Sequence, residues 1–276
     1  MGLRIASNLA AERVQSNLRK ISKKTDGALQ SLSSGKRITK ASDDSAGLAI
    51  ATTMSAQVSG LRQALRNAND GMSLVQVAEG SMNESSNLLV RMKELAVQAA
   101  SDTVGEVERS MINLEFQQTI KEIDRISEVT IYNGVKLLNG EGKDLYSFQV
   151  GANGGSANTI EYDAGNINAS SSSLGVSSLS VDDRSGALDS VEVVQEALNN
   201  LSSQRASLGA IQNRLQSAIN TIDNSMIQQE HARSIIEDVD VAESASQLVA
   251  SSINKNAAIA SLAQANTIPK SAISLI

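Results

Sequence analysis

The stretch "LSSGKRITKASDDSAGLAIA", residues 32 to 51, separates two segments whose apolar residues recur at helical spacing. Ser33, Ser34 and Gly35 are residue types typical of a helix end. Asp43 and Asp44 are typical of a helix start, where the helix dipole favours acids. A metal pair is the weaker interpretation, because the spacing and distal Glu of an EF-hand are missing. We therefore expect a joint between two helical rods.

The segments on either side of this joint follow a strict 4,3 spacing of apolar residues. The upstream one, residues 7 to 32, places six of eight seam positions on apolar residues. The downstream one, from 54 to 96, does so at ten of thirteen, and its last apolar residues drift to Leu88, Met92, Leu95 and Ala99. The pattern predicts one short and one very long helix with narrow apolar seams.

Further along the chain, the same spacing predicts three more helices. One runs from Ile112 to Ile126 after a turn at "SDTVGE", residues 101 to 106, and another from Val191 to Ile236. The last, 242 to 275, is rich in Ala and Ser and only weakly amphipathic. The predicted fold class is mainly α, with long antiparallel helices in a bundle and a coiled coil.

Residues 140 to 185 have a different character, with many Gly, Asn and Ser residues. Tyr146, Phe148 and Val150 alternate in "LYSFQV", and Ile160 and Tyr162 alternate in "TIEYDA". Turn residues separate the two runs, so we expect a β-hairpin. The following "NASSSSLGVSSLS" is expected to be a surface loop.

Composition limits the possible functions. The 276 residues include no Trp, two Phe and three Tyr, which suits a thin helical bundle better than an ordinary globular core. Without cysteine there can be no disulfide or thiolate metal site. The sequence has no apolar run long enough to cross a membrane and no secretory signal. Unaided, these features predict a soluble cytosolic protein without membrane insertion.

The charges are unevenly distributed along the chain, although the net charge is only −6. Residues 1 to 40 hold nine Lys or Arg against Glu12 and Asp26, whereas residues 223 to 243 hold six acids against Arg233. The segments could be solvated helix faces, or they could meet in the fold.

The sequence carries few of the residues and motifs that are typical of catalytic sites. His231 is the single histidine and lies in the polar run "QQEHAR", without a serine or cysteine nucleophile motif elsewhere. The glycines near 151 to 155 lack the Lys-Ser/Thr of a phosphate loop. We predict no enzyme, no catalytic or metal residues, no cofactor and no nucleic-acid partner.

Several long stretches resemble the bacterial flagellin family. They are the opening stretch, "NANDGMSLVQVAEGSMNE" (67 to 84), "RMKELAVQA" (91 to 99), "EIDRISEVTIYNGVKLL" (122 to 138), "LGAIQNRLQSAI" (208 to 219), "ARSIIEDVDVAE" (232 to 243) and "LAQANTIPKSAISLI" (262 to 276). They cover nearly all of the chain outside 140 to 187 and occur in the family's order. Larger members have hypervariable outer domains in the place of that short segment, so the chain resembles a short form.

The resemblance implies a subunit that polymerises into the flagellar filament for swimming motility. Residues 1–44 and 237–276 would form inner-core helices with a spoke, and 45–236 an outer-core bundle that carries 140–185. The spoke and polymerisation residues would be Ser33, Ser34, Gly35, Lys36, Arg37, Asp43, Asp44, Glu237, Asp238 and Asp240. The inner-core packing residues would be Val14, Leu18, Ile21, Leu32, Leu248, Ile253, Ile259 and Leu262.

Location and partners are also implied by the resemblance. The chain would be exported without a cleaved signal peptide, through the flagellar type III apparatus, to the extracellular flagellum. Its partners would be other subunits, an export chaperone, and cap and junction proteins. A host Toll-like receptor is a further candidate partner, contacting Arg91, Leu95 and Glu115. Arg91 and Leu95 are four apart and are expected to share a helix face.

The terminal segments carry few large apolar residues for their length. Their burial against each other is not expected to offset the entropy lost on ordering, so the ends should order only on assembly. Three alternatives are a hook–filament junction protein of the same superfamily, a signalling coiled coil of chemoreceptor type, and an enzyme that uses His231. Long filaments of pure protein would favour flagellin over the first, and a stable rod-like dimer would favour the second.

Overall fold

The computed structural model describes residues 8–141, 145–165 and 167–273, with side chains up to 267 in the last helix. Residues 1–7 and 274–276, which belong to the terminal segments assigned to the inner core, lie outside the described residues. The chain divides into two compact units: unit 1 comprises residues 1–56 and 227–276, and unit 2 comprises 57–226. Among the described helices, none is long and apolar enough to cross a membrane.

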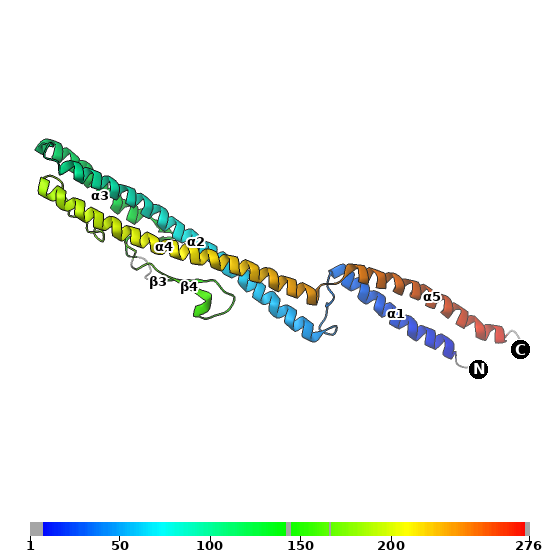
Figure 1. Cartoon of the computed structure of the whole chain (residues 1–276). Helices are drawn as coiled ribbons and strands as arrows, with labels where there is room; N and C mark the ends of the chain where they lie inside the picture. The colour runs from blue at the N-terminus through cyan, green and yellow to red at the C-terminus, as the bar shows by residue number, and fades with distance from the viewer. Residues whose placement is uncertain (1–7, 142–144, 166, 274–276) are drawn as a thin grey trace. The chain divides into compact units, whose positions relative to one another are not determined.

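Five helices dominate the structure, as the fold-class prediction required (Figure 1). They are α1 (Leu9–Ser34), α2 (Ser45–Ala99), α3 (Glu106–Val129), α4 (Arg184–Glu237) and α5 (Val241–Ile273). In unit 2, α3 runs back along α2, and α4 lies beside both (Figure 1). The predicted mainly α fold is confirmed.

The core of unit 2 is filled largely by aliphatic side chains from the facing helices, as the composition predicted. Phe116 of α3 is fully buried among them. Other fully buried side chains come from α2 and α4; they include Met82, Leu89, Met92, Leu201, Leu208 and Leu215. The seam of apolar residues read from the sequence is therefore the surface on which these helices pack.

Two arginines close the turn between α2 and α3. Arg109 donates from Nε to the Ala99 carbonyl at 2.7 Å and from Nη2 to the Ser101 carbonyl at 2.9 Å. Arg184 donates to the Ala100 carbonyl at 3.3 Å. The guanidinium groups thus bind carbonyls at and just after the C-terminus of α2, where positive charge is favoured; the Ser101 carbonyl also accepts from the Val104 N–H at 3.3 Å.

A short hairpin that we did not predict follows α3. Strand β1 (Ile131–Tyr132) pairs antiparallel with β2 (Val135–Lys136) through a two-residue turn. Asn133 and Gly134 have φ of 49° and 81°, the left-handed conformations that Asn-Gly adopts in such turns. The dipeptide was available in the sequence as a hairpin signal.

The predicted hairpin in 140–185 is confirmed. Strand β3 (Leu145–Gln149) pairs antiparallel with β4 (Thr159–Asp163), with Tyr146 opposite Tyr162. The short 3₁₀ turn η1 (Ser156–Asn158) precedes β4. The hairpin packs on a small-residue face of α2, because a Cβ on Gly71 would lie 2.9 Å from Cδ1 of Phe148. Asn67 of the same face donates to the Gln149 carbonyl at 3.2 Å.

The serine-rich segment after β4 is not the surface loop that we expected. Its apolar residues enter the core: Val176 is fully buried and Leu174 is 5% exposed. The backbone on either side of these two residues is held by polar groups of α3, since Asp124 binds Ser171 and Asn113 accepts from the Val181 N–H at 3.2 Å. Residues 167–181 therefore form a strap that completes the bundle.

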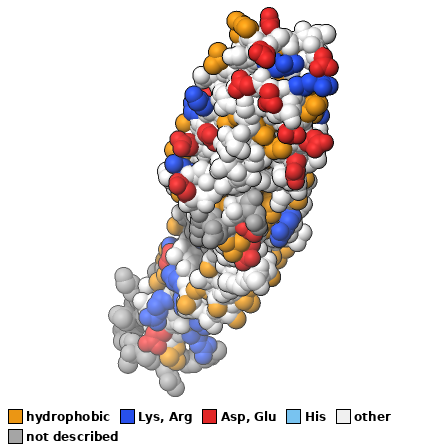
Figure 2. Space-filling view, turned by 90° about the vertical axis from the view of Figure 1, so that its left-hand side faces the viewer, with side chains coloured by type: hydrophobic (Ala, Val, Ile, Leu, Met, Phe, Trp, Pro, Cys, Tyr) orange, Lys and Arg blue, Asp and Glu red, His pale blue; other side chains and the backbone are white. Residues whose placement is uncertain are grey.

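Acidic side chains, with basic ones among them, lie over the end of unit 2 that is formed by the α2–α3 turn and the start of α4 (Figure 2). They include Glu94, Asp102, Glu106, Asp182 and Asp183. Arg184 pairs with Asp102 at 3.1 Å across this end.

In unit 1, α1 and α5 lie side by side (Figure 1). Asn8 caps α1 by accepting from the Ala11 N–H at 3.1 Å, and its own amide donates to the Ala265 carbonyl of α5 at 2.9 Å. The start of α1 and the far part of α5 therefore meet at the same end of the pair.

Candidate assembly site

The joint between α1 and α2 contacts the end of α4. Gly35 ends α1 in the left-handed conformation, with φ of 70°. The next residue, Lys36, forms an antiparallel bridge with Asp238, flanked by the Arg37 N–H to Glu237 carbonyl bond at 2.7 Å and the Val239 N–H to Gly35 carbonyl bond at 3.1 Å. Two chain segments about 200 residues apart are thereby joined like strands of a sheet.

Charged side chains reinforce this bridge. Lys36 forms an ion pair with Glu237, which Arg233 also approaches at 3.8 Å. Arg37 donates from Nη2 to the Ile236 carbonyl at 2.6 Å. The Glu237 side chain is only 14% exposed, so it is the best shielded charge of the group. The structure thus brings basic and acidic segments together at this bridge.

The second half of the joint is organised by two aspartates with different roles. Asp43 accepts from the Thr39 hydroxyl at 3.0 Å and from the backbone N–H groups of Thr39 and Lys40 at 3.2 and 3.0 Å. These bonds lower the pKa of Asp43, the Thr39 hydroxyl contributing most. Asp44 caps α2 through the Gly47 N–H at 2.8 Å. Ile38 is buried at 3% exposure.

The remaining predicted spoke residues are more exposed. Ser33 and Ser34 lie in the last turn of α1, where the Ser34 hydroxyl donates to the Ser31 carbonyl at 3.3 Å. Asp240 accepts from the Ala242 and Glu243 N–H groups and so caps α5. Asp238 has its backbone in the bridge and its side chain in solvent.

A cleft of about 710 Å³ opens between α1 and α5 beside the bridge. Its walls carry small residues, including Gly27, Ala28 and Ser31 of α1, and its rim carries charges. The charged residues are Lys24, Arg37, Asp238, Asp240 and Glu243. The cleft is open and lined by mixed chemistry, which suits a protein surface more than a small ligand.

The predicted packing residues of α1 and α5 are only partly covered. Val14, Leu18, Ile21, Leu32, Leu248 and Leu262 are half-buried. Ile253 and Ile259 are 63% and 48% exposed, so the structure does not place them in the contact between the two helices. No residue of α1 is buried, and of the α5 side chains up to 267 only Ala265 is. The pair has seams but no core of its own.

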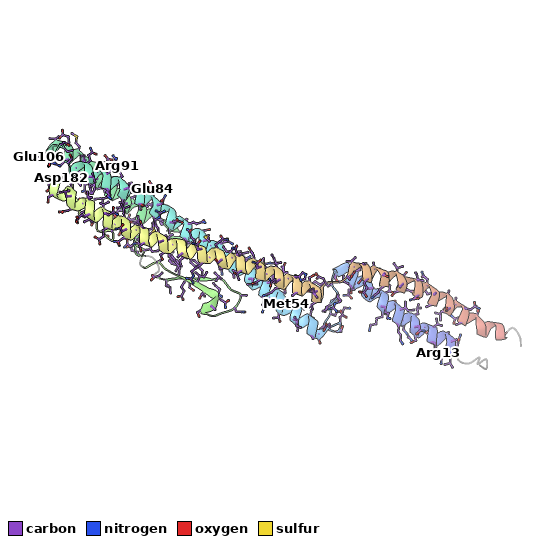
Figure 3. All side chains as sticks on the ribbon, in the orientation of Figure 1. Arg13, Met54, Glu84, Arg91, Glu106 and Asp182 are labelled. Atoms are coloured by element: carbon purple, nitrogen blue, oxygen red, sulfur yellow. The ribbon has the colours of Figure 1, made fainter. Side chains whose placement is uncertain are left out.

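The fold brings two of the candidate receptor residues, Arg91 and Glu115, together at the surface and places the third, Leu95, in the core. Arg91 is half exposed and donates from Nη2 to Glu115 at 2.6 Å, and from Nη1 to Glu94 at 3.2 Å. These carboxylates raise the pKa of Arg91, with Glu115 contributing most. Leu95 is 2% exposed and belongs to the core, so the expectation of an apolar contact there at the surface is wrong. Figure 3 labels Arg91 near the same end of unit 2 as Glu106 and Asp182.

His231 is exposed. Among the described residues, no cluster of three or more His, Cys, Asp or Glu could hold a metal ion. What the fold presents instead is a pair of helices with uncovered apolar residues, joined at a charged bridge. This arrangement defines the class of the protein, a helical structural subunit whose exposed seams require further chains to cover them.

Comparison with known proteins identifies the family within that class. The model of the bacterial flagellin N-terminal helical region matches residues 5–143, and that of the C-terminal helical region matches 191–276. The chain therefore belongs to the bacterial flagellin family and is a structural subunit of the flagellar filament. Its 276 residues make it a short form.

Similar sequences support this assignment over almost the whole chain. Flagellin of Halalkalibacterium halodurans is 41% identical over 249 residues, which are 90% of each chain. Flagellin of Bacillus subtilis is 37% identical, with 99% of this chain and all of that one covered. Flagellin A of Vibrio cholerae aligns over 379 positions, so it carries segments that this chain lacks.

Solved structures agree with the fold. The crystal structure of Bacillus cereus flagellin matches with a TM-score of 0.51 and 28% identity, over 57% of this chain and 88% of that one. A putative flagellar hook-associated protein from Vibrio parahaemolyticus matches with a TM-score of 0.58 but 13% identity, over 71% of this chain and 99% of that one. The second likeness concerns the fold alone and does not favour the junction-protein alternative.

Proposed function

We propose that the chain enters the filament through α1 and α5, which complete their packing only against neighbouring copies. The supporting observation is the absence of buried residues in α1 together with large exposed side chains on both helices. They include Leu9, Leu29, Val249, Ile253 and Ile259, each roughly half exposed or more. Copies packed around such a pair would bury this surface, so ordering of the ends and polymerisation become one event.

The joint at 33–44 acts in this proposal as the spoke of the subunit, with its returning partner at 233–241. Residues 1–44 and 237–276 form the inner core together with the spoke, and 45–236 form the outer core. The bridge from Lys36 to Asp238 and the ion pair from Lys36 to Glu237 support this role, because they fasten both terminal helices to one point.

The finer aspects of location and partners rest on family membership. The chain is exported through the flagellar type III apparatus to the extracellular flagellum, and an export chaperone, the cap and the junction proteins are its partners on that route. The lack of cysteine in the sequence is compatible with passage as an unfolded chain. Loss of secretion from cells in which the export apparatus is disabled is the expected result, and unchanged secretion would contradict this route.

A Toll-like receptor remains a proposed partner of the monomer, with Arg91 and Glu115 as candidate contacts. Their half-exposed ion pair supports this role. Because Leu95 is buried, Val90 and Val97 supply the apolar part of that surface. They are 46% and 54% exposed. Together with Lys93, Glu94 and Gln98 these two valines line a shallow hollow of about 440 Å³. In the filament the surface is covered by packed subunits.

Seeded growth tests the central proposal. Purified monomer is added to short, sheared filament fragments, and filament length is followed by electron microscopy. Long filaments of this protein alone are the expected result. A chain that only adds a short cap of a few subunits would favour the junction-protein alternative instead.

A further inference from the structure

Three cations lie along one side of α1. Arg13, Lys20 and Lys24 are spaced at i, i+7 and i+11, which places them on one helix face, and all three are exposed. The face is about a quarter turn away from the half-buried seam of Val14 and Ile21 that meets α5. We name these three residues the basic flank; Figure 3 labels Arg13 near the start of α1.

The basic flank has no acidic partner among the residues that the structure describes. Lys36 and Arg233 of unit 1 each pair with Glu237. Within the described part of the chain, none of the three flank residues takes part in an ion pair or a side-chain hydrogen bond. The basic excess of residues 1 to 40 is therefore only partly neutralised, at the bridge.

The same side of the helix pair becomes acidic further along. Lys24, Gly27 and Ser31 form one wall of the cleft, and Asp238 and Glu243 line its other end. We name these two carboxylates the acidic end. Asp240 is left out because it caps α5.

Distance prevents Arg13 and Lys20 from neutralising the acidic end, whereas Lys24 lines the same cleft as these carboxylates and, among the described residues, forms no ion pair with them. Lys20 precedes Gly35, where the bridge begins, by 15 residues, or about 22 Å of helix. The Debye length at physiological salt is about 8 Å, so the attraction between Lys20 and the acidic end is largely screened. One side of the pair thus carries Arg13 and Lys20 toward the start of α1 and the acidic end beside the bridge, with Lys24 lying between them at the cleft.

We propose that the basic flank of one copy docks on the acidic end of a second copy, displaced along the helix pair. The inference rests on the proposed assembly through α1 and α5. It adds which two surfaces of neighbouring helix pairs come into contact. Because the contact joins two different patches, it is heterologous and leaves both patches free at the ends of the row. Such a contact continues indefinitely instead of closing as a dimer, and it sets the register between copies by charge.

Charge reversal tests the contact. Variant A carries Arg13→Glu, Lys20→Glu and Lys24→Glu, and variant B carries Asp238→Lys and Glu243→Lys. In each, both patches have the same sign, so like charges meet and elongation of sheared wild-type filaments falls by about tenfold or more. A mixture of A and B restores elongation, because the patches of alternating copies are then opposite in sign. Urea unfolding, which reports on unit 2, remains unchanged in both variants.

The matched control reverses two cations on the side of α1 that faces away from α5. Arg19 and Lys23 are exposed and lie among Glu12 and Asp26, so that face is mixed in sign. Arg19→Glu with Lys23→Glu should leave elongation within about twofold of the wild type. An equal loss in this control would attribute the effect to total charge and overturn the proposal.

Other results separate the proposal from the function on which it rests. If the wild type does not elongate, assembly through the terminal helices itself fails. If the wild type and both variants elongate alike, or if A and B fail together as a mixture, only the charged contact is overturned. Loss in A with normal growth in B would assign the basic flank to an anionic partner other than a second copy, and would also overturn it.

Discussion

Asp124 of α3 holds Ser171 through both of its carboxylate oxygens, accepting the Ser171 backbone N–H and hydroxyl at 2.8 Å each. Ser171 is 3% exposed, so water cannot replace these bonds without moving the strap. Asp124→Ala should lower the free energy of unfolding by about 2 to 4 kcal/mol, because two buried donors lose their acceptor. Urea denaturation measures this, with Glu128→Ala on the same helix as control. A loss below about 0.5 kcal/mol would show that the strap is held by apolar packing alone.

Two glycines of α2 provide a matched pair of substitutions that tests where the β3–β4 hairpin packs on this helix. A Cβ on Gly71 would lie 2.9 Å from Cδ1 of Phe148, whereas a Cβ on Gly80 would meet nothing within 4 Å. Gly71→Ala should destabilise unit 2 by about 1 to 3 kcal/mol through overpacking. Gly80→Ala should stabilise it by about 0.5 to 1 kcal/mol, since helical glycine is less favourable than alanine. Equal effects of both substitutions in thermal unfolding would contradict the packing of the β3–β4 hairpin on α2 at Gly71.

Substitutions at Leu95 and at Arg91 should distinguish a loss of stability from a loss of receptor binding. Leu95→Ala removes a buried side chain and should cost about 2 to 5 kcal/mol of unfolding free energy. Arg91→Ala and Glu115→Ala change exposed groups, so the fold should persist while binding of monomer to the receptor weakens. Surface plasmon resonance with monomer and with filament tests this, and filament should not bind. Undiminished binding by a folded Arg91→Ala, Glu115→Ala variant would remove the proposed site.

The loop around Asp43 in the spoke should become less stable at low pH. Hydrogen bonds from Thr39 and Lys40 lower the pKa of Asp43 below its ordinary value of 3.8, so the ionised form is favoured in the folded loop. The resulting stabilisation is fully present above pH 3.8 and is lost as the pH falls through the lower folded-state pKa. The protection factors of the Thr39 and Lys40 amides, which correct for the pH dependence of intrinsic exchange, should therefore fall at low pH, and Asp43→Asn should weaken that pH dependence. Identical acid profiles in the two proteins would rule out Asp43 as the cause.

The terminal helices should be cleaved more readily than unit 2 in dilute monomer. The α1–α5 pair lacks a core, whereas unit 2 has one that spans α2, α3 and α4. Limited proteolysis should trim α1 and α5 first, and incorporation into filaments should protect them. Deleting residues 1 to 34 should leave a folded, soluble bundle that cannot polymerise. Protection of both helices in dilute monomer would contradict the proposal that they order on assembly.

Helix positions could be predicted from the sequence because the apolar seam is long and regular. Phe116, Ile123 and Leu208 all lie at predicted seam positions and are buried at 0% exposure. The strap could not be recognised in the same way, since Leu174 and Val176 stand among serines without a helical or strand period. Its order comes from side chains of α3, which are distant in the sequence.

The error at Leu95 has a different origin. Spacing of four residues places two side chains on neighbouring parts of a helix surface, but a seam is narrow enough for one to be buried and the other exposed. Leu95 continues the drifting seam of Leu88, Met92 and Ala99, and that pattern was the better guide. The spoke bridge was predicted only through the family resemblance and the charge asymmetry, because pairing between Lys36 and Asp238 leaves no periodic trace.

The hydrogen bond from Asn8 to Ala265 spans 257 residues, so α1 meets its partner only after almost the entire chain has been made. A nascent chain must therefore carry α1 unpaired throughout synthesis, with Leu9 and Leu29 uncovered. The two hairpins and the α2–α3 turn, by contrast, close over short stretches and can form early. The α1 segment is thus without its α5 partner while the residues between them are being synthesised, and its apolar side chains can aggregate during that time.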